Sequence, residues 1–148
     1  NRGGDITFHG YGQIVGYPII DLENFYTDIN RYLRSLEEIV ISTLNFYKIS
    51  SKRSSGETGV WLEPNSPYSR KICAIGVKTS RWVTMHGFAL NVDTDLSYYD
   101  YIIPCGIKGK GITSINKEIK KSVSINEVKE KLLQNLKKTF DANLIFSV

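Results

Sequence analysis

Cysteine, histidine and methionine are scarce in this chain of 148 residues, and their scarcity excludes several kinds of site. The two cysteines, Cys73 and Cys105, are too few for a disulfide framework, which favours a reducing, cytoplasmic compartment. The two cysteines and two histidines never occur at the spacing of metal ligands, so we expect no metal site. No apolar run approaches the length needed to cross a bilayer, and we expect no membrane partner.

Three signatures of catalysis and nucleotide binding are also missing. The chain has no Gly-x-Ser-x-Gly nucleophile elbow and no P-loop. The run Gly10-Tyr11-Gly12 lacks the third glycine of a dinucleotide fingerprint, so it is weak evidence for a nucleotide. We therefore expect no bound cofactor.

The overall composition is that of an ordinary globular protein, with 41% hydrophobic and 23% charged residues. We expect a single domain over residues 1–148. The net charge of +4 arises from residues 117–138, where seven lysines accompany three glutamates. This pattern favours a solvated helix face over a docking surface for an acidic protein or a nucleic acid.

A glycine-rich run occupies residues 1–13 and is typical of a binding loop that enters a strand. Gly3 and Gly4 let backbone N–H groups approach a ligand, and Arg2 adds a fixed positive charge beside them. Functional loops rarely begin a domain, and the only methionine is Met85. We therefore expect an N-terminally incomplete domain.

Hydrophobic periodicity divides the rest of the chain into strands and two helices. Apolar residues recur at helical spacing over residues 24–46, and a capping box from Ser124 to Glu127 predicts a second helix that ends near Thr139. Strands and helices without regular alternation indicate an α+β sheet domain. The expected strands are 5–9, 13–20, 59–62, 71–78 and 82–92, with a polar loop at 50–58 and a short helix or turn at 95–101.

Cys105 has the local sequence that is most typical of a reactive thiol. Pro104 fixes the backbone before it and Gly106 permits a steep turn after it, so the thiol can be presented at a sheet edge. The alternative is a small buried hydrophobe, which is the usual environment of a free cysteine. For Cys73, which lies within an apolar strand, we expect packing in the core.

A thiol needs a neighbouring group to ionise near neutral pH. The candidate helpers are His9, His86 and the lysines, although a structural role is favoured for each histidine and a solvated position for an average lysine. Lys71 differs from the average because it begins an apolar strand. We expect its ammonium to lie near the end of the sheet rather than in open water.

Four segments follow one another in a characteristic order. They are RGGDITFHG at residues 2–10, TGVW at 58–61, RKI at 70–72 with AIGV at 74–77 and HGFALN at 86–91, and PCGI at 104–107. Together they resemble the lipoyl(octanoyl) transferase family over about residues 1–115. The chain departs from the family pattern at Tyr11, where proline is usual. Family members also carry a segment before the residue that matches Arg2, which contributes strands, and we expect this segment to be missing here.

The resemblance implies a mixed β-sheet flanked by helices, shared with lipoate and biotin ligases. It implies octanoyl transfer from octanoyl-acyl carrier protein to a lysine of a lipoyl domain, in a 2-oxoacid dehydrogenase or in the glycine cleavage H protein. Cys105 falls on the acyl-thioester nucleophile, and Lys71 falls on the lysine that lowers the pKa of that thiol. The implied substrate-binding residues are Arg2, Gly3, Gly4, Asp5, Ile6, Thr7, Phe8, His9, Ala74, Ile75, Gly76, Gly87, Phe88 and Ala89.

The residue types agree with this chemistry. A positive neighbour favours a thiolate, and a thiolate attacks a thioester readily, so no ATP is required. Small residues in the implied binding segments would leave a groove for a linear chain, with Ile75 and Phe88 as walls. The basic C-terminal face could meet the acidic acyl carrier protein.

Other functions stay open at this point. An ATP-dependent lipoate or biotin-type ligase would share the fold but would form an acyl-adenylate and need no catalytic cysteine. A non-catalytic basic module would bind nucleic acid in a salt-dependent manner, whereas the transferase function predicts no nucleic-acid partner. A truncated, inactive remnant would still bind acyl chains.

Overall fold

The computed structural model describes residues 7–102 and 110–145. The strands of this part are β1 (Gln13–Gly16), β2 (Lys52–Ser54), β3 (Glu57–Leu62), β4 (Arg70–Ser80), β5 (Val83–Asn91) and β6 (Gly111–Ile112). Its helices are the α-helices α1 (Ile29–Phe46), α2 (Ile115–Ile119) and α3 (Ile125–Phe140), with the 3-10 helices η1 (Leu22–Asn24) and η2 (Leu96–Tyr101).

These strands form one sheet in the order β1-β5-β4-β3-β2, and every neighbouring pair in this path is antiparallel. The short strand β6 differs, because it pairs with the start of β4 in parallel. The sheet is therefore mixed, and the predicted α+β class is confirmed.

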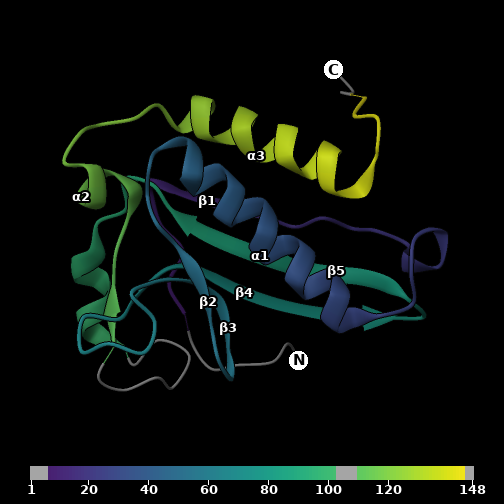
Figure 1. Ribbon diagram of the computed structural model, residues 1–148, viewed down its shortest axis with the longest axis horizontal. Helices are drawn as coiled ribbons and strands as arrows, with labels where there is room; N and C mark the ends of the chain where they lie inside the picture. Colours follow the sequence, from purple (N-terminus) through teal and green to yellow (C-terminus); the bar gives the residue numbers. More distant parts are fainter. Residues whose placement is uncertain (1–6, 103–109, 146–148) are drawn as a thin grey trace.

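Helices α1 and α3 lie side by side over one face of the sheet (Figure 1). Helix α1 begins where the Asp28 carboxylate accepts a hydrogen bond of 3.0 Å from the backbone N–H of Arg31. Its apolar stripe, which includes Leu36, Val40 and Leu44, is fully buried in the hydrophobic core. Each such side chain contributes about 1.5–3 kcal/mol by leaving water, so this face anchors the fold.

Two of the expected boundaries are wrong. Helix α1 begins at Ile29 rather than at 24, because Asp28 caps it and residues 22–24 form η1 instead. The polar loop predicted for residues 50–58 contains β2 and the start of β3. Strand β2 lies at an edge of the sheet, where polar and exposed side chains are compatible with strand pairing.

Three local predictions are also wrong. Residues 7–9 are not part of a strand, and the strand predicted for 13–20 ends at Gly16. Helix α3 begins at Ile125 as expected, but the Ser124 side chain makes no capping hydrogen bond. The Glu127 carboxylate instead accepts a bond of 3.3 Å from the Tyr47 hydroxyl, which ties α3 to the end of α1.

The predictions for most of the longer strands and helices are confirmed. Strands β4 and β5 and helix α3 agree with the expected spans to within about two residues, and η2 is the expected short helix. The segments β6 and α2 were not predicted. They have two and five residues, which is too short for hydrophobic periodicity to reveal.

Candidate functional site

The two strands β4 and β5 bring two predicted binding segments together. Their register pairs Ala74 with Ala89 and Gly76 with Gly87, so residues 74–76 and 87–89 lie directly opposite each other. Alternate residues of a strand point to opposite faces of a sheet. The alanines and glycines therefore share one face, which we call the small-residue face.

The opposite face of the same strands belongs to the core. Ile75 and Phe88 also pair with each other, and both side chains pack in the hydrophobic cluster beneath the helices. Their exposed fractions are only 7% and 6%. Strand alternation thus directs both side chains toward the helices and away from the small-residue face, and their role as walls of an acyl groove stays a prediction.

Gly87 has a packing role in the structure, and its part in substrate binding stays a prediction. A Cβ at this position would collide with the carbonyl oxygen of Gly16, and it would lie 3.0 Å from Cδ of Pro18. Glycine is therefore required here because the end of β1 crosses close to β5. The space that a side chain at position 87 would occupy is filled by Gly16 and Pro18.

A β-bulge decides where Lys71 points. Val60 pairs with Cys73 and Trp61 pairs with Lys71, so one step along β3 corresponds to two steps along β4, and Ile72 is the extra residue. Ile72 and Cys73 consequently both belong to the core cluster. Lys71 is shifted onto the small-residue face, the face that also carries Ala74.

Lys71 is held in a defined environment on that face. Its residue is only 7% exposed, and its Nζ lies 4.5 Å from the centre of the Trp61 ring. Gly59 lies beside the lysine, and glycine is required there because a Cβ would lie 2.5 Å from the Cys73 carbonyl oxygen, whereas its distance of 3.5 Å from Lys71 Cε would be an ordinary contact. Gly59 also has a φ of +111°, a conformation that other residues avoid.

A polar network lies beside Lys71 and was not predicted. The Gln13 side-chain amide donates to the Asn91 side-chain oxygen at 2.8 Å and to the Tyr99 hydroxyl at 3.2 Å. Asn91 in turn donates to the Thr113 carbonyl at 3.0 Å, and the Thr113 N–H donates to the Lys71 carbonyl at 2.9 Å. The signal in the sequence was a polar residue, Asn91, within the apolar run of β5.

The network also holds the described part of the N-terminal run. Gln13 donates to the Phe8 carbonyl at 3.3 Å and shares a hydrogen bond of 2.8 Å with the exposed His9 ring. The Phe8 ring stacks on Tyr98 with centroids 5.0 Å apart. Residues 7–9 are thus brought to the same end of the sheet as Lys71, whereas Arg2 to Ile6 lie outside the described residues.

His86 and the two cysteines are the remaining candidates for reactive groups beside Lys71. His86 pairs with Val77, and six residues of β4 place it about 20 Å from Lys71, so it is not a helper at this site. Cys73 is fully buried, and burial raises the pKa of its thiol, which confirms the expected core role. Cys105 lies outside the described residues, and its role stays a prediction.

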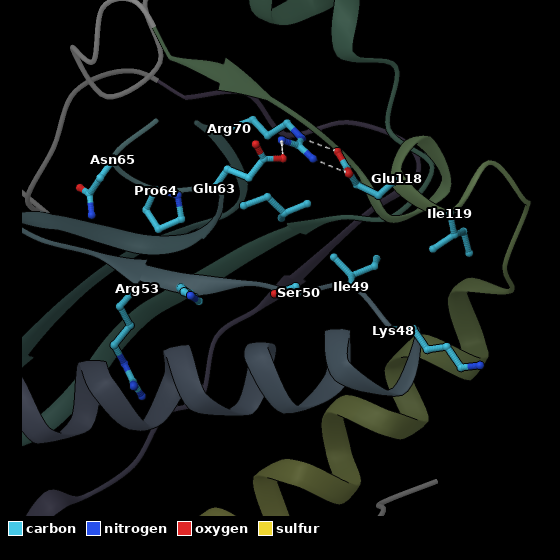
Figure 2. A pocket seen from close by; sticks show the side chains of 12 residues that line it. Lys48, Ile49, Ser50, Arg53, Glu63, Pro64, Asn65, Arg70, Glu118 and Ile119 are labelled. Carbon is cyan, nitrogen blue, oxygen red and sulfur yellow. Dashed lines mark hydrogen bonds and ion pairs between the residues drawn. The ribbon is translucent and has the colours of Figure 1, made fainter. Parts of the chain in front are cut away.

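A cavity of about 490 Å³ lies elsewhere, between the β3–β4 turn and α2. In Figure 2, Arg70 points toward Glu118 and Glu63, and the nitrogen–oxygen distances are 2.7 and 2.8 Å. Arg70 directly precedes Lys71, but its side chain lines this cavity rather than contacting Trp61. The cavity contains none of the predicted site residues.

The described residues contain neither a metal-binding cluster nor a membrane-spanning helix. Over residues 7–102 and 110–145, no cluster of three or more histidine, cysteine, aspartate or glutamate side chains is placed to bind a metal ion. The helices within the same ranges are too short or too polar to cross a membrane.

The chain is similar in sequence to proteins named octanoyltransferase. It is 64% identical over 145 residues to that of Christiangramia forsetii, covering 97% of this chain and 62% of the relative. It is 63% identical over 146 residues to that of Flavobacterium psychrophilum, covering 98% and 63%. The chain therefore spans about three-fifths of the length of the curated relatives it matches.

The fold is similar to that of solved ligases. A bi-partite lipoate protein ligase from Thermoplasma acidophilum matches with a TM-score of 0.74 and 18% identity, over 99% of this chain and 58% of that one. A biotin protein ligase from Aquifex aeolicus matches with a TM-score of 0.67 and 17% identity, over 88% and 50%. At these identities the likeness shows a common fold alone.

The family is shown by a match to a family model. The model of the lipoyl protein ligase A/B catalytic domain matches residues 1–137, which is most of the chain. The sequence resemblance, the α+β sheet and the similarity to octanoyltransferases all agree with this match. The chain belongs to the lipoyl protein ligase A/B catalytic domain family.

Proposed function

We propose that this protein transfers an octanoyl group from octanoyl-acyl carrier protein to a lysine of a lipoyl domain. The observation that carries the proposal is the position of Lys71, which the Ile72 bulge directs to the small-residue face beside Ala74. The similarity to octanoyltransferases supports the same reaction. The nucleophile that we propose is Cys105, on the basis of its PCGI segment.

The first step exchanges one thioester for another. The Cys105 thiol gives its proton to Lys71, and the thiolate attacks the octanoyl carbonyl. The bond between this carbonyl and the Cys105 sulfur forms as the bond to the carrier sulfur breaks. The departing carrier thiolate takes the proton from Lys71, so atoms and charge balance without ATP.

The second step forms an amide. The neutral amine of the acceptor lysine attacks the octanoyl carbonyl on Cys105, a C–N bond forms, and the C–S bond breaks. Lys71, in its neutral form, accepts the proton lost by the attacking nitrogen and returns it to the Cys105 sulfur. Its burial beside Trp61 favours this role, since partial desolvation makes an ammonium a better proton donor.

We assign the acyl chain to the small-residue face. Ala74 and Ala89 lie opposite each other there and project only methyl groups, which leaves room for a linear alkyl chain. Phe8 and Tyr98 provide a stacked aromatic wall at the end where Lys71 lies. Arg2 to Ile6, Thr7 and His9 remain proposed binding residues on the strength of the RGGDITFHG segment.

Intact-mass spectrometry of the full-length protein after incubation with octanoyl-acyl carrier protein tests this function. We expect a gain equal to one octanoyl group, lost in Cys105→Ser and kept in the matched control Cys73→Ser. A lipoyl domain should then remove the adduct and gain the octanoyl group as an amide. No adduct on the wild type, or an adduct that survives in Cys105→Ser, would contradict the mechanism.

The requirement for ATP separates this function from that of a ligase. Thioester exchange and aminolysis proceed without ATP in the proposed mechanism. We therefore expect the same rate of octanoyl transfer with and without ATP. A strict requirement for ATP would favour an acyl-adenylate and would overturn the proposal.

A further inference from the structure

Trp61 contacts two lysine ammonium groups rather than one. Lys71 Nζ lies 4.5 Å from the centre of its ring and Lys110 Nζ lies 4.9 Å from it. Trp61 is only 1% exposed, and its indole N–H has no hydrogen-bond partner among residues 7–102 and 110–145. The buried ring is therefore used mainly as an aromatic surface for cations.

Lys110 is fixed in place by the β2–β3 hairpin. Its Nζ lies 2.6 Å from the Glu57 carboxylate, and that same oxygen accepts a hydrogen bond of 2.7 Å from the Ser54 hydroxyl. The side chains of Lys110 and Glu57 are 29% and 22% exposed, so the pair is shielded but not buried. Lys110 lowers the pKa of the Glu57 carboxyl chiefly through this hydrogen bond, and Lys71 adds to the effect.

The two ammonium groups are close enough to influence each other. Because both contact one ring, their separation cannot exceed the sum of the two ring distances, which is about one Debye length at physiological salt. A neighbouring positive charge favours the neutral form of an amine. Lys110 therefore makes Lys71 a stronger acid and increases its neutral fraction near pH 7.

The other charged groups on the neighbouring elements face other partners or solvent. Arg70 pairs with two glutamates in the cavity beside α2. Glu37 of α1 is buried on the helix side and pairs with two arginines, and Lys52 of β2 is exposed to solvent. Glu57 is the acidic group whose carboxyl both lysines influence. The buried Cys73 thiol stays neutral because burial raises its pKa.

We infer that Lys110 is a positioning residue that tunes the proton affinity of Lys71 through their shared contact with Trp61. The inference rests on the proposed function for its catalytic meaning, because a neutral Lys71 is the base of the second step. Its physical content does not depend on the reaction. Removing the Lys110 charge should make Lys71 hold its proton to higher pH.

The indole N–H of Trp61 provides a direct reporter in the intact protein. The chain has two tryptophans, so Trp82→Phe leaves a single indole signal in a 1H–15N NMR spectrum. This signal, followed from about pH 6 to pH 11, should titrate with Lys71, and Lys71→Arg should remove that transition. In Lys110→Gln we expect its midpoint to rise by about 0.3–1 pH unit, whereas Lys110→Arg should leave it unchanged.

A matched control removes an equal charge from the other side of the molecule. Lys131 also lies over an aromatic ring, 4.3 Å from the centre of Phe46, but on the helix side. Lys131→Gln should leave the Trp61 midpoint where it is. A midpoint that stays constant or falls in Lys110→Gln, or that moves equally in Lys131→Gln, would overturn the inference.

The rate of octanoyl transfer should depend on Lys110 in the same way as the NMR midpoint does. Lys110→Gln should move the pH profile of octanoyl transfer to the acceptor lysine to higher pH by the same amount. A shift of this size makes the rate near pH 7 about two- to tenfold lower. The NMR titration needs no substrate. A shifted midpoint without octanoyl transfer would therefore refute the proposed function alone, and transfer without a shift would refute the role of Lys110 alone.

Discussion

The two faces of the β4–β5 hairpin differ in almost every property. On the helix face, Cys73, Ile75, Phe88 and Leu90 are all nearly inaccessible and pack against α1 and α3. On the other face the same two strands project alanine and glycine, followed by a lysine. The helix face uses bulk to exclude water, and the small-residue face is the one to which we assign the acyl chain.

One pair of strands can therefore place stabilising side chains on one face and binding side chains on the other by alternation alone. Side chains that alternate along a strand cannot share a face, so large and small residues are sorted automatically. Lys71 breaks the alternation, and only the bulge at Ile72 keeps it out of the core. Changes on the two faces should therefore have different consequences.

The largest effect should come from the charge on the small-residue face. Lys71→Met should slow octanoyl transfer by about 10²–10⁴-fold, the usual contribution of a positioned general base. The loss should appear in the rate of adduct formation and in its release to the lipoyl domain. Thermal unfolding should change little, and Lys131→Met should keep its activity. A rate within a few-fold of the wild type would remove Lys71 from catalysis.

A change on the helix face should act on stability instead. Leu90→Ala deletes a fully buried side chain and should lower the free energy of unfolding by about 2–5 kcal/mol. Denaturant unfolding followed by circular dichroism measures this loss. The surviving folded fraction should still form the octanoyl adduct. A folded, stable variant that fails to form it would show that the two faces are not independent.

A moderate effect is expected from filling the small-residue face. Ala74→Leu adds three carbons opposite Ala89, and it should raise the KM for the octanoyl donor about tenfold and shift preference toward shorter chains. Ala74→Gly is the opposite change and should tolerate longer chains. Competition between donors of different chain length measures both. An unchanged chain-length preference in Ala74→Leu would place the acyl chain elsewhere.

The smallest effect concerns a charge pair away from both faces. The Arg70 guanidinium holds the pKa of the Glu118 carboxyl below its ordinary value of 4.5, and the Thr113 hydroxyl assists. The pair therefore stabilises the fold above that value and loses its contribution as pH falls through the lowered pKa. Glu118→Gln should cost about 1 kcal/mol at pH 7, allowing for solvent screening.

The fall of the free energy of unfolding at acid pH isolates the contribution of the Arg70–Glu118 pair. Unfolding measured from pH 7 down to about pH 2 should show a shallower decline for Glu118→Gln than for the wild type. Glu130→Gln, which changes an exposed glutamate of α3, should keep the wild-type decline. Equal slopes for all three proteins would assign the acid dependence to other groups.

Long periodic segments were predictable because many residues repeat the same signal. Helix α3, the core face of β4 and β5, and the burial of Cys73 all follow from apolar spacing. Short or polar segments were not, since β2 and β6 carry little apolar pattern and are formed by pairing with their neighbours. The core packing of Ile75 and Phe88 was not predictable from their motifs, because a motif gives residues but not the face they occupy.

By itself the sequence determined the family and the fold class, since its four motifs and its hydrophobic spacing are local properties of the chain. It also identified Lys71 as a lysine out of place at the start of an apolar strand. Only the tertiary structure decided that this lysine lies on the small-residue face beside Trp61 and Lys110. The reason is that a bulge is set by strand register, and register depends on which distant strand pairs with β4.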